Sequence, residues 1–103
     1  MIKHVVMWKL KETAEGNTAE ENAVLMKKKL EDLKNQIPQI QKIEVGISYR
    51  HEKEDLDIIL ITQFATKYEL EEYQHHKAHE PVNEFIKKVK AERYCVDFKS
   101  TKK

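Results

Sequence analysis

The sequence has few of the residues that form crosslinks, linkers and tight turns. Its 103 residues include one cysteine, two glycines and two prolines. A single cysteine excludes a disulfide within the chain. So few glycines and prolines leave no flexible linker and no glycine-rich phosphate loop. We therefore expect one domain over residues 1–103 and predict no cofactor.

Long apolar runs and a charge excess are also absent. No uncharged apolar run is longer than four residues, which predicts no transmembrane helix, no signal peptide and a cytoplasmic location. Lys plus Arg is 19 and Asp plus Glu is 18, so the charge balance predicts neither nucleic acid nor a membrane as a partner. Hydrophobic residues make up 40%, a lean core that favours a second copy of the chain as partner.

Alternating apolar residues predict strands at residues 2–10, 43–49, 56–64 and 94–98. In the first, Ile2, His4, Val6, Trp8 and Leu10 share one face. The segment 56–64 is apolar on both faces, which is typical of a strand in the middle of a covered sheet. Gly46, inside the second strand, predicts a bulge or a bend.

Two capping boxes predict where helices begin. Thr18 with Glu21 opens the first helix, and Thr66 with Glu69 opens another. The apolar stripe of the first helix consists of Ala23, Met26, Leu30, Leu33 and Ile37, and Pro38 ends it. Pro81 fits the first turn of a further short helix that carries Val82, Phe85, Ile86 and Val89.

The order strand, helix, strand, strand, helix, strand predicts an α+β protein with a ferredoxin-like βαββαβ sheet and its helices on one face. The other face would carry Val5, Met7, Ile59 and Ile61. An apolar face of this kind needs a cover, and a second copy would supply it. We therefore expect two sheets packed face to face about a two-fold axis, which forms a dimeric α/β barrel.

Five segments in order resemble the stress-responsive A/B barrel (Dabb) family of the dimeric α/β-barrel superfamily: MIKHVVMWKLK, IPQIQKIEVG, DLDIILITQF, YQHHKAH and VDF. The fourth is similar to the family's Tyr-x-x-His-Pro-x-His signature, with Lys77 in place of the proline. Most members have no assigned reaction, whereas a polyketide cyclase branch is enzymatic. In that branch the signature tyrosine and second histidine are catalytic, which implies Tyr73 and His79 here.

The resemblance also implies the ligand-binding residues. His4 matches a histidine that lines the pocket between sheet and helices, and we expect Val6, Trp8 and His76 to complete the set. Some family structures hold a hard cation on backbone carbonyls at the end of the first helix. The matching carbonyls are those of Lys34, Ile37 and Ile40, although free carbonyls at a helix end ordinarily bind water.

Tyr73 and His79 support two interpretations. A continuous helix would place them on different faces, but a helix that breaks between them could bring both to one pocket. A histidine that titrates near neutrality beside a tyrosine hydroxyl is suited to acid–base chemistry. The alternative is structural: Tyr73 packs its ring, and His79 caps or braces the next helix.

A metal is the third interpretation of the histidine-rich stretch. His75 and His79 are four residues apart, and His76 and His79 three, which are spacings that chelate on a helix. The His-Glu-x-x-His pattern of zinc proteases is absent, because residue 76 is histidine. We therefore predict no transition-metal site. We also expect Cys95 to be a buried, inert thiol and His51 to be solvated.

Three functions follow. The first is a homodimer that binds a small apolar molecule, without established catalysis. The second is an acid–base enzyme, polyketide cyclase-like, that uses Tyr73 and His79 on a small apolar or aromatic substrate. The third is a structural protein with a filled interior. We favour the first, with catalysis as the alternative.

Overall fold

The computed structural model describes residues 1–50 and 52–101. The elements are β1 (Ile2–Leu10), β2 (Thr13–Ala14), β3 (Asn17–Thr18), α1 (Ala19–Gln36), β4 (Lys42–Ile47), β5 (Ile58–Phe64), α2 (Lys67–His75), α3 (His79–Val89) and β6 (Lys90–Lys99). All four predicted strands are present, and so are the three predicted helices: the one opened by Thr18, the one opened by Thr66 and the short one with Pro81 in its first turn. The predicted solvation of His51 lies outside the described residues.

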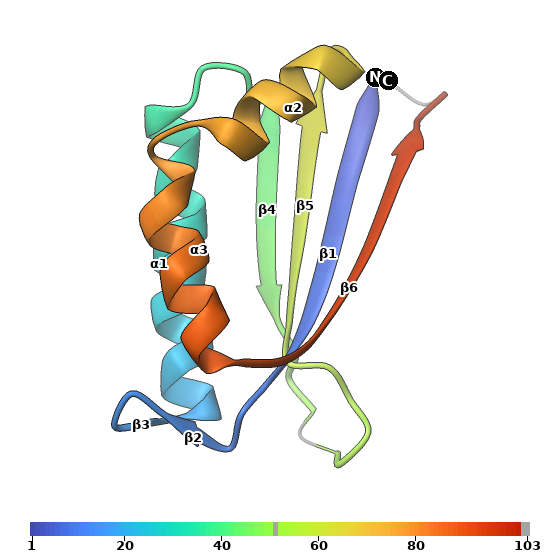
Figure 1. Ribbon diagram of the computed structural model, residues 1–103. Helices are drawn as coiled ribbons and strands as arrows, with labels where there is room; N and C mark the ends of the chain where they lie inside the picture. The colour runs from blue at the N-terminus through green and yellow to red at the C-terminus, as the bar shows by residue number, and fades with distance from the viewer. Residues whose placement is uncertain (51, 102–103) are drawn as a thin grey trace.

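The main sheet has the order β4-β5-β1-β6, and all its neighbours are antiparallel. This is the ferredoxin-like arrangement that the element order predicts. Figure 1 shows α1 and α3 side by side as a layer over one face of the sheet, with α2 crossing at the end where both termini lie. The strand that is apolar on both faces, β5, is internal, as predicted.

The first helix begins and ends where its sequence signals predict. The Thr18 side chain accepts from the Glu21 N–H at 3.2 Å, and the Glu21 carboxylate accepts from the Thr18 N–H at 2.9 Å. Each bond satisfies a donor that the first turn would otherwise leave unpaired. The helix ends at Ile37, just before Pro38. Its apolar stripe faces the sheet and forms the most buried part of the core.

The chain leaves the helical conformation between α2 and α3 without a proline. His76 is the C-cap of α2 and has extended backbone angles. Its ring Nδ1 accepts from the Ala78 N–H at 3.0 Å, and its carbonyl accepts from the His79 N–H at 3.0 Å. These bonds hold the turn that the family's proline would otherwise enforce. Lys77 therefore does not prevent a break at this point.

The two faces of the sheet differ in cover. Residues of β1 alternate strictly between buried and half-buried, and the buried set faces the helices. On the open face, Val5 pairs with Ile61 and Val96, and Met7 pairs with Ile59 and Tyr94. The β6 members are largely exposed, Val96 at 56% and Tyr94 at 48%. An apolar band therefore crosses this face from β5 to β6.

The sequence predicts a bulge or a bend at Gly46, and the structure shows no bulge there. β4 and β5 pair without a register shift from Lys42 to Ile47. A Cβ added to Gly46 would lie 3.3 Å from Cγ2 of Ile59, which is closer than ordinary van der Waals contact. The close approach of the neighbouring strand's side chain explains the glycine.

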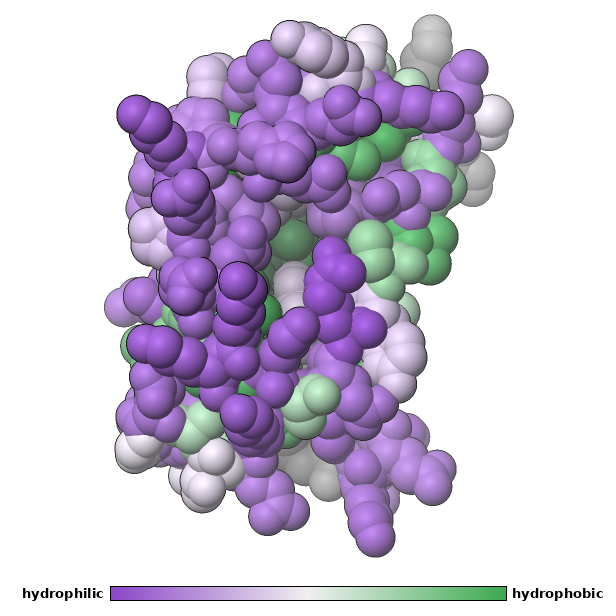
Figure 2. All heavy atoms as spheres, in the orientation of Figure 1, coloured by the Kyte–Doolittle hydropathy of each residue, from purple (hydrophilic) through white to green (hydrophobic). Residues whose placement is uncertain are grey.

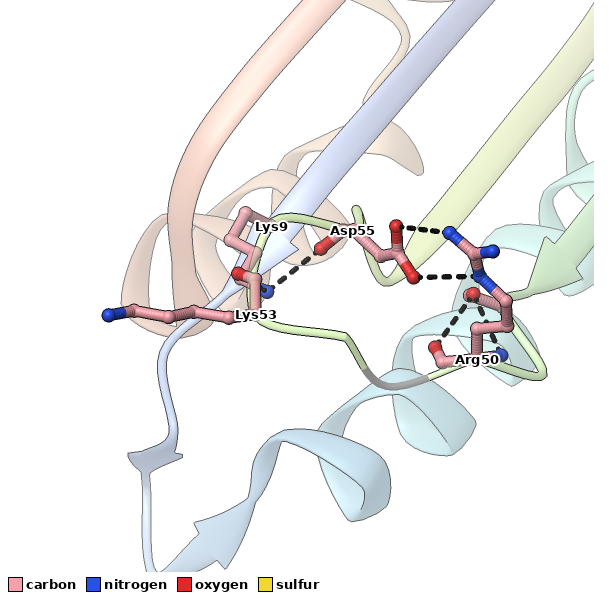
Figure 3. A network of polar contacts seen from close by, with 5 residues as sticks. Lys9, Arg50, Lys53 and Asp55 are labelled. Carbon is pink, nitrogen blue, oxygen red and sulfur yellow. Dashed lines mark hydrogen bonds and ion pairs between the residues drawn. The ribbon is translucent and has the colours of Figure 1, made fainter.

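The connection between β4 and β5 is rich in charged residues, and polar contacts organise it (Figure 3). Asp55 accepts two hydrogen bonds from the Arg50 guanidinium, at 3.0 and 3.1 Å. These bonds and the guanidinium charge lower the pKa of the Asp55 carboxyl. Lys9 donates to the carbonyls of Lys53 and Asp55, at 3.2 and 2.8 Å. The loop is thereby attached to the end of β1.

A short hairpin of β2 and β3 precedes α1. Glu15 and Gly16 both have positive φ, 53° and 78°, which is the geometry of a tight two-residue hairpin turn. The Asn22 side chain donates to the Ala14 carbonyl at 3.0 Å and so ties the hairpin to α1. Among the described residues, no helix combines the length and the apolar character that a membrane crossing needs.

Candidate functional site

A cavity of about 340 Å³ lies between the sheet and α3. This volume is at the lower end of the range for small-molecule sites. Figure 2 shows it as a hollow with hydrophobic atoms at its base and hydrophilic residues around its mouth. The lining residues come from all three helices and from β1, β5 and β6: His4, Val6, Trp8, Leu30, Leu60, Tyr73, Gln74, His79, Asn83, Ile86, Lys87, Lys90 and Arg93.

His4, Val6 and Trp8 form the floor of this pocket. Their exposed fractions are 3%, 1% and 3%. They occupy alternate positions of β1, so their side chains share one face. The regular pairing of β1 with β5 from Ile2 to Trp8 keeps that parity intact. The structure therefore brings these three predicted ligand-binding residues to one cavity, under the helices.

Tyr73 and His79 meet at the inner wall. Their ring centroids are 4.7 Å apart, with the planes at 71°, which is an edge-to-face contact. The break between α2 and α3 makes this contact possible, because residues six apart in a continuous helix would lie on different faces. Tyr73 is fully buried and also contacts the Phe64 ring, at 5.1 Å between centroids.

The environment of His79 favours its neutral form. Burial lowers its pKa to about 4, and the positive charges of His4, Arg93 and His76 act in the same direction. The ring is therefore uncharged at pH 7. Asn83 donates from Nδ2 to His79 Nδ1 at 2.7 Å, which leaves the ring proton on Nε2. In this tautomer the second ring nitrogen is a hydrogen-bond donor.

Two polar atoms of pocket-lining residues are buried without a partner among the described residues. They are the indole nitrogen Nε1 of Trp8 and the hydroxyl oxygen of Tyr73. Burial also raises the pKa of the Tyr73 hydroxyl well above its ordinary value, so both groups are neutral hydrogen-bond donors. A buried donor without an acceptor is costly and uncommon in native proteins.

His4, Cys95 and Asp97 form a second cluster, on adjacent strands at the edge of the pocket. The Asp97 carboxylate is hydrogen-bonded to His4 Nδ1. Cys95 Sγ lies 3.7 Å from that nitrogen and 3.5 Å from the carboxylate. These three ligand atoms lie within 4.8 Å of one another, so the set could hold a metal ion. Within this set, the His4 imidazole and the Asp97 carboxylate already pair with each other.

The prediction that Cys95 is buried is wrong, because the residue is exposed. It lies on β6, an edge strand that the helices do not cover along most of its length. The expected inertness has a different cause. Partial desolvation, followed by the charge and hydrogen bond of Asp97, raises the pKa of the thiol. Cys95 is therefore protonated at neutral pH.

The histidines of the YQHHKAH segment do not share one helix. α2 ends at His75, and α3 begins at His79. The helical spacings on which chelation by His75, His76 and His79 depends are therefore not realised. His76 is not among the residues that line the pocket; its ring braces the interhelix turn.

The carbonyls considered for a hard cation lie where α1 ends. Ile37 is the C-cap of the helix, and Ile40 lies three residues further on, at the start of the connection to β4. The Ile40 N–H donates to the Ile37 carbonyl at 3.2 Å. One of the three proposed ligands is thus already used in a turn.

Sequence reasoning missed several polar and charged pocket residues, among them Asn83, Lys87, Lys90 and Arg93. Arg93 pairs with Trp8 across β1 and β6, so both side chains lie on the helix-covered face. Strand parity relative to Cys95 would have identified Arg93, and helical spacing of four from His79 would have identified Asn83. Lys87 and Lys90 offer no such signal, because lysines are common at helix ends.

Comparison with known proteins gives a family and a set of folds. The sequence model of the stress responsive A/B barrel domain matches residues 2–100. No curated protein matches the sequence.

Several solved structures are similar over nearly the whole chain. A dimeric protein of unknown function with a ferredoxin-like fold, from Bacteroides fragilis, is 30% identical with a TM-score of 0.79, and covers 96% of this chain and 95% of its own. A dimeric ferredoxin-like protein of unknown function from Thermobifida fusca is 18% identical, with a TM-score of 0.79 and coverage of 94% and 88%. The hydroxynitrile lyase of Passiflora edulis is 10% identical, with a TM-score of 0.75 and coverage of 94% and 90%. The last two resemblances establish the fold alone.

Proposed function

Because this chain belongs to the stress responsive A/B barrel domain family, we propose that it is a homodimer that binds a small, largely apolar molecule between its sheet and its helices. Its proposed location is the cytoplasm, which the lone unpaired cysteine favours. Similar proteins from Bacteroides fragilis and Thermobifida fusca are described as dimeric and of unknown function. Neither the family nor these similar proteins bring an established catalytic activity.

The unpaired donors of Trp8 and Tyr73 are the observation that carries the binding proposal. Each costs about 1–3 kcal/mol while it is buried without an acceptor. Apolar side chains at these positions would avoid that cost. A bound molecule with an oxygen acceptor beside one of these donors would satisfy it, and Val6, Leu60 and Ile86 offer that molecule an apolar surface. Stability alone gives no reason for this combination.

The apolar band on the open face supports the homodimer. Tyr94, Val96 and Phe98 are 44–56% exposed in a single chain and lie beside the half-buried Val5 and Met7. A second copy placed on the same face would bury all of them about a two-fold axis. An obligate interface of this type buries on the order of 2,000 Å² or more.

The single tryptophan provides a direct test of binding. Trp8 lines the pocket, so its one indole N–H resonance reports an occupant. We expect that resonance to shift during titration with a two-ring aromatic probe, either 2-naphthoate or 2-naphthamide. An indole resonance that stays in place with both probes at millimolar concentration would contradict the proposal.

Acid–base catalysis, of the polyketide cyclase-like kind, is the second candidate, and the contact between Tyr73 and His79 favours it. A neutral histidine could accept a proton while the tyrosine hydroxyl polarises a carbonyl. Two features weigh against it. A base of pKa about 4 is weak at neutral pH, and the bond from Asn83 leaves the proton on Nε2. The similarity to a hydroxynitrile lyase, at 10% identity, concerns the fold alone.

Two variants separate binding from catalysis. If His79 is the base, His79→Ala lowers turnover of a cyclisable polyketide or cyanohydrin roughly 10²–10⁴-fold and leaves the dimer folded. If His79 is structural, His79→Ala costs about 1–2 kcal/mol through the lost bond to Asn83, and probe binding is unchanged. Tyr73→Phe, which removes one hydroxyl, serves as the milder companion in both assays.

A further inference from the structure

The residues that line the pocket carry positive charge and no negative charge. Three lining residues are cationic, Lys87, Lys90 and Arg93, and none of the lining residues bears a carboxylate. Lys87 lies 3.6 Å from the carboxylate of Glu84 on the exposed surface of α3. In the described part of the chain, neither Lys90 nor Arg93 has a carboxylate within ion-pair distance. The chain as a whole is nearly neutral, at +1, so this is a local property.

Arg93 lies close enough to influence the inner groups of the pocket. Its positive charge opposes the effect of burial on the Tyr73 hydroxyl and adds to the effect of burial on His79. Arg93 is also the cross-strand partner of Trp8. The Arg93 guanidinium, the Trp8 indole N–H and the Tyr73 hydroxyl belong to residues of the same pocket, and each can donate hydrogen bonds. None of these three groups bears a negative charge.

From this arrangement we infer that the natural occupant is a small amphipathic acid. Its carboxylate, or an equivalent oxyanion, lies at Arg93 and Lys90, and its apolar or aromatic body lies against Val6, Leu60 and Ile86. A further oxygen accepts from Tyr73 or Trp8. This inference rests on the proposed binding function and adds the charge of the ligand. Arg93 is the residue that determines specificity, because it alone combines a fixed charge with proximity to the inner donors.

A matched pair of probes tests the charge. 2-Naphthoate and 2-naphthamide share one aromatic body and differ in the negative charge. We expect isothermal titration at low ionic strength to show naphthoate binding about 10- to 100-fold more tightly, which is the range of a charge-assisted hydrogen bond. That preference should shrink as salt is raised.

The two arginines of the chain, Arg50 and Arg93, provide the matched control. Arg93→Gln should bring the two affinities to within about threefold of each other, whereas Arg50→Gln, in the loop after β4, should keep the preference for naphthoate. Equal affinities of the wild-type protein for both probes would overturn the inference and leave the binding function standing. A preference that survives Arg93→Gln would overturn the role of Arg93. Failure of both probes to bind would overturn the binding function as well.

Discussion

Val5 and Val6 are adjacent in β1 and have opposite surroundings. Val6 is 1% exposed and lies under the helices of its own chain. Val5 is half-buried on the open face, between Ile61 and Val96 of the neighbouring strands. The covered face therefore obtains its burial within one chain and also contains the pocket. The open face also carries apolar residues, and no described part of the chain covers it. The two faces of β1 thus differ: the helices of the same chain cover one of them, and covering the other requires a second copy.

A charge on the open face should have the largest effect. Val96→Lys places an ammonium group in both halves of the proposed interface, because a two-fold axis duplicates each change. We expect the dimer to weaken at least about 100-fold, since burial of an unpaired charge costs several kcal/mol. Light scattering measures the loss. Val24→Lys on α1 is the control, because Val24 is as exposed as Val96, at 55% against 56%.

The valine pair itself should separate the two faces next. Val6→Ala removes two methyl groups from a packed site and should lower the free energy of unfolding by about 1–3 kcal/mol at every protein concentration. Val5→Ala should cost less, and its cost should grow when the protein is diluted below the dimer's dissociation range. Urea unfolding at two concentrations, 100-fold apart, distinguishes them. Identical concentration dependence of the two variants would remove the distinction between the faces.

The covered face should also respond to pH through His79. Its pKa of about 4 in the folded protein is lower than the roughly 6.5 of an unfolded chain, so the unfolded state binds the proton first. Stability is therefore complete above about pH 6.5 and falls as the pH approaches 4, by about 1–2 kcal/mol at pH 5. Urea unfolding between pH 5 and 7.5 measures the slope. His79→Gln should flatten it, whereas His75→Gln, at the exposed end of α2, should not.

Tyr73→Phe should have the smallest effect and the opposite sign. The hydroxyl is buried without a partner among the described residues, so its removal should raise the free energy of unfolding by about 1 kcal/mol, while the contacts with Phe64 and His79 remain. Probe binding should weaken in the same variant. A variant that is less stable and binds equally well would show that the hydroxyl has a structural role.

The sequence predicts the sheet and its two faces well, because an alternating pattern constrains every residue of a strand at once. The parity of His4, Val6 and Trp8 was therefore predictable, and so was the burial of β5. The sequence predicts a further short helix with Pro81 in its first turn, but it leaves open whether the helix breaks between Tyr73 and His79, because no proline marks that point. The break depends on the His76 ring and the Ala78 N–H, a contact that a sequence pattern does not specify. The hairpin at residues 13–18 was missed for a related reason: Gly16 was its one local signal.

The edge strand β6 produced further errors. Its residues alternate between an open face and a helix-side face that the helices do not reach, so apolar and polar residues are exposed on both sides. Burial of Cys95 was inferred from its residue type, and that inference fails on a strand that the helices leave uncovered. The same uncertainty concealed Arg93 and Asp97, whose importance comes from Trp8 and His4 across the strand pair rather than from their own neighbours in sequence.

The most direct test of whether a second copy covers the open face of the sheet is the mass of the native protein in solution. Light scattering at micromolar concentration should give twice the chain mass of 12.3 kDa, and Val96→Lys should reduce it to one chain mass. A wild-type protein that remains a folded, stable monomer at that concentration would contradict the proposal that a second copy covers Val5, Met7 and the exposed side chains of β6.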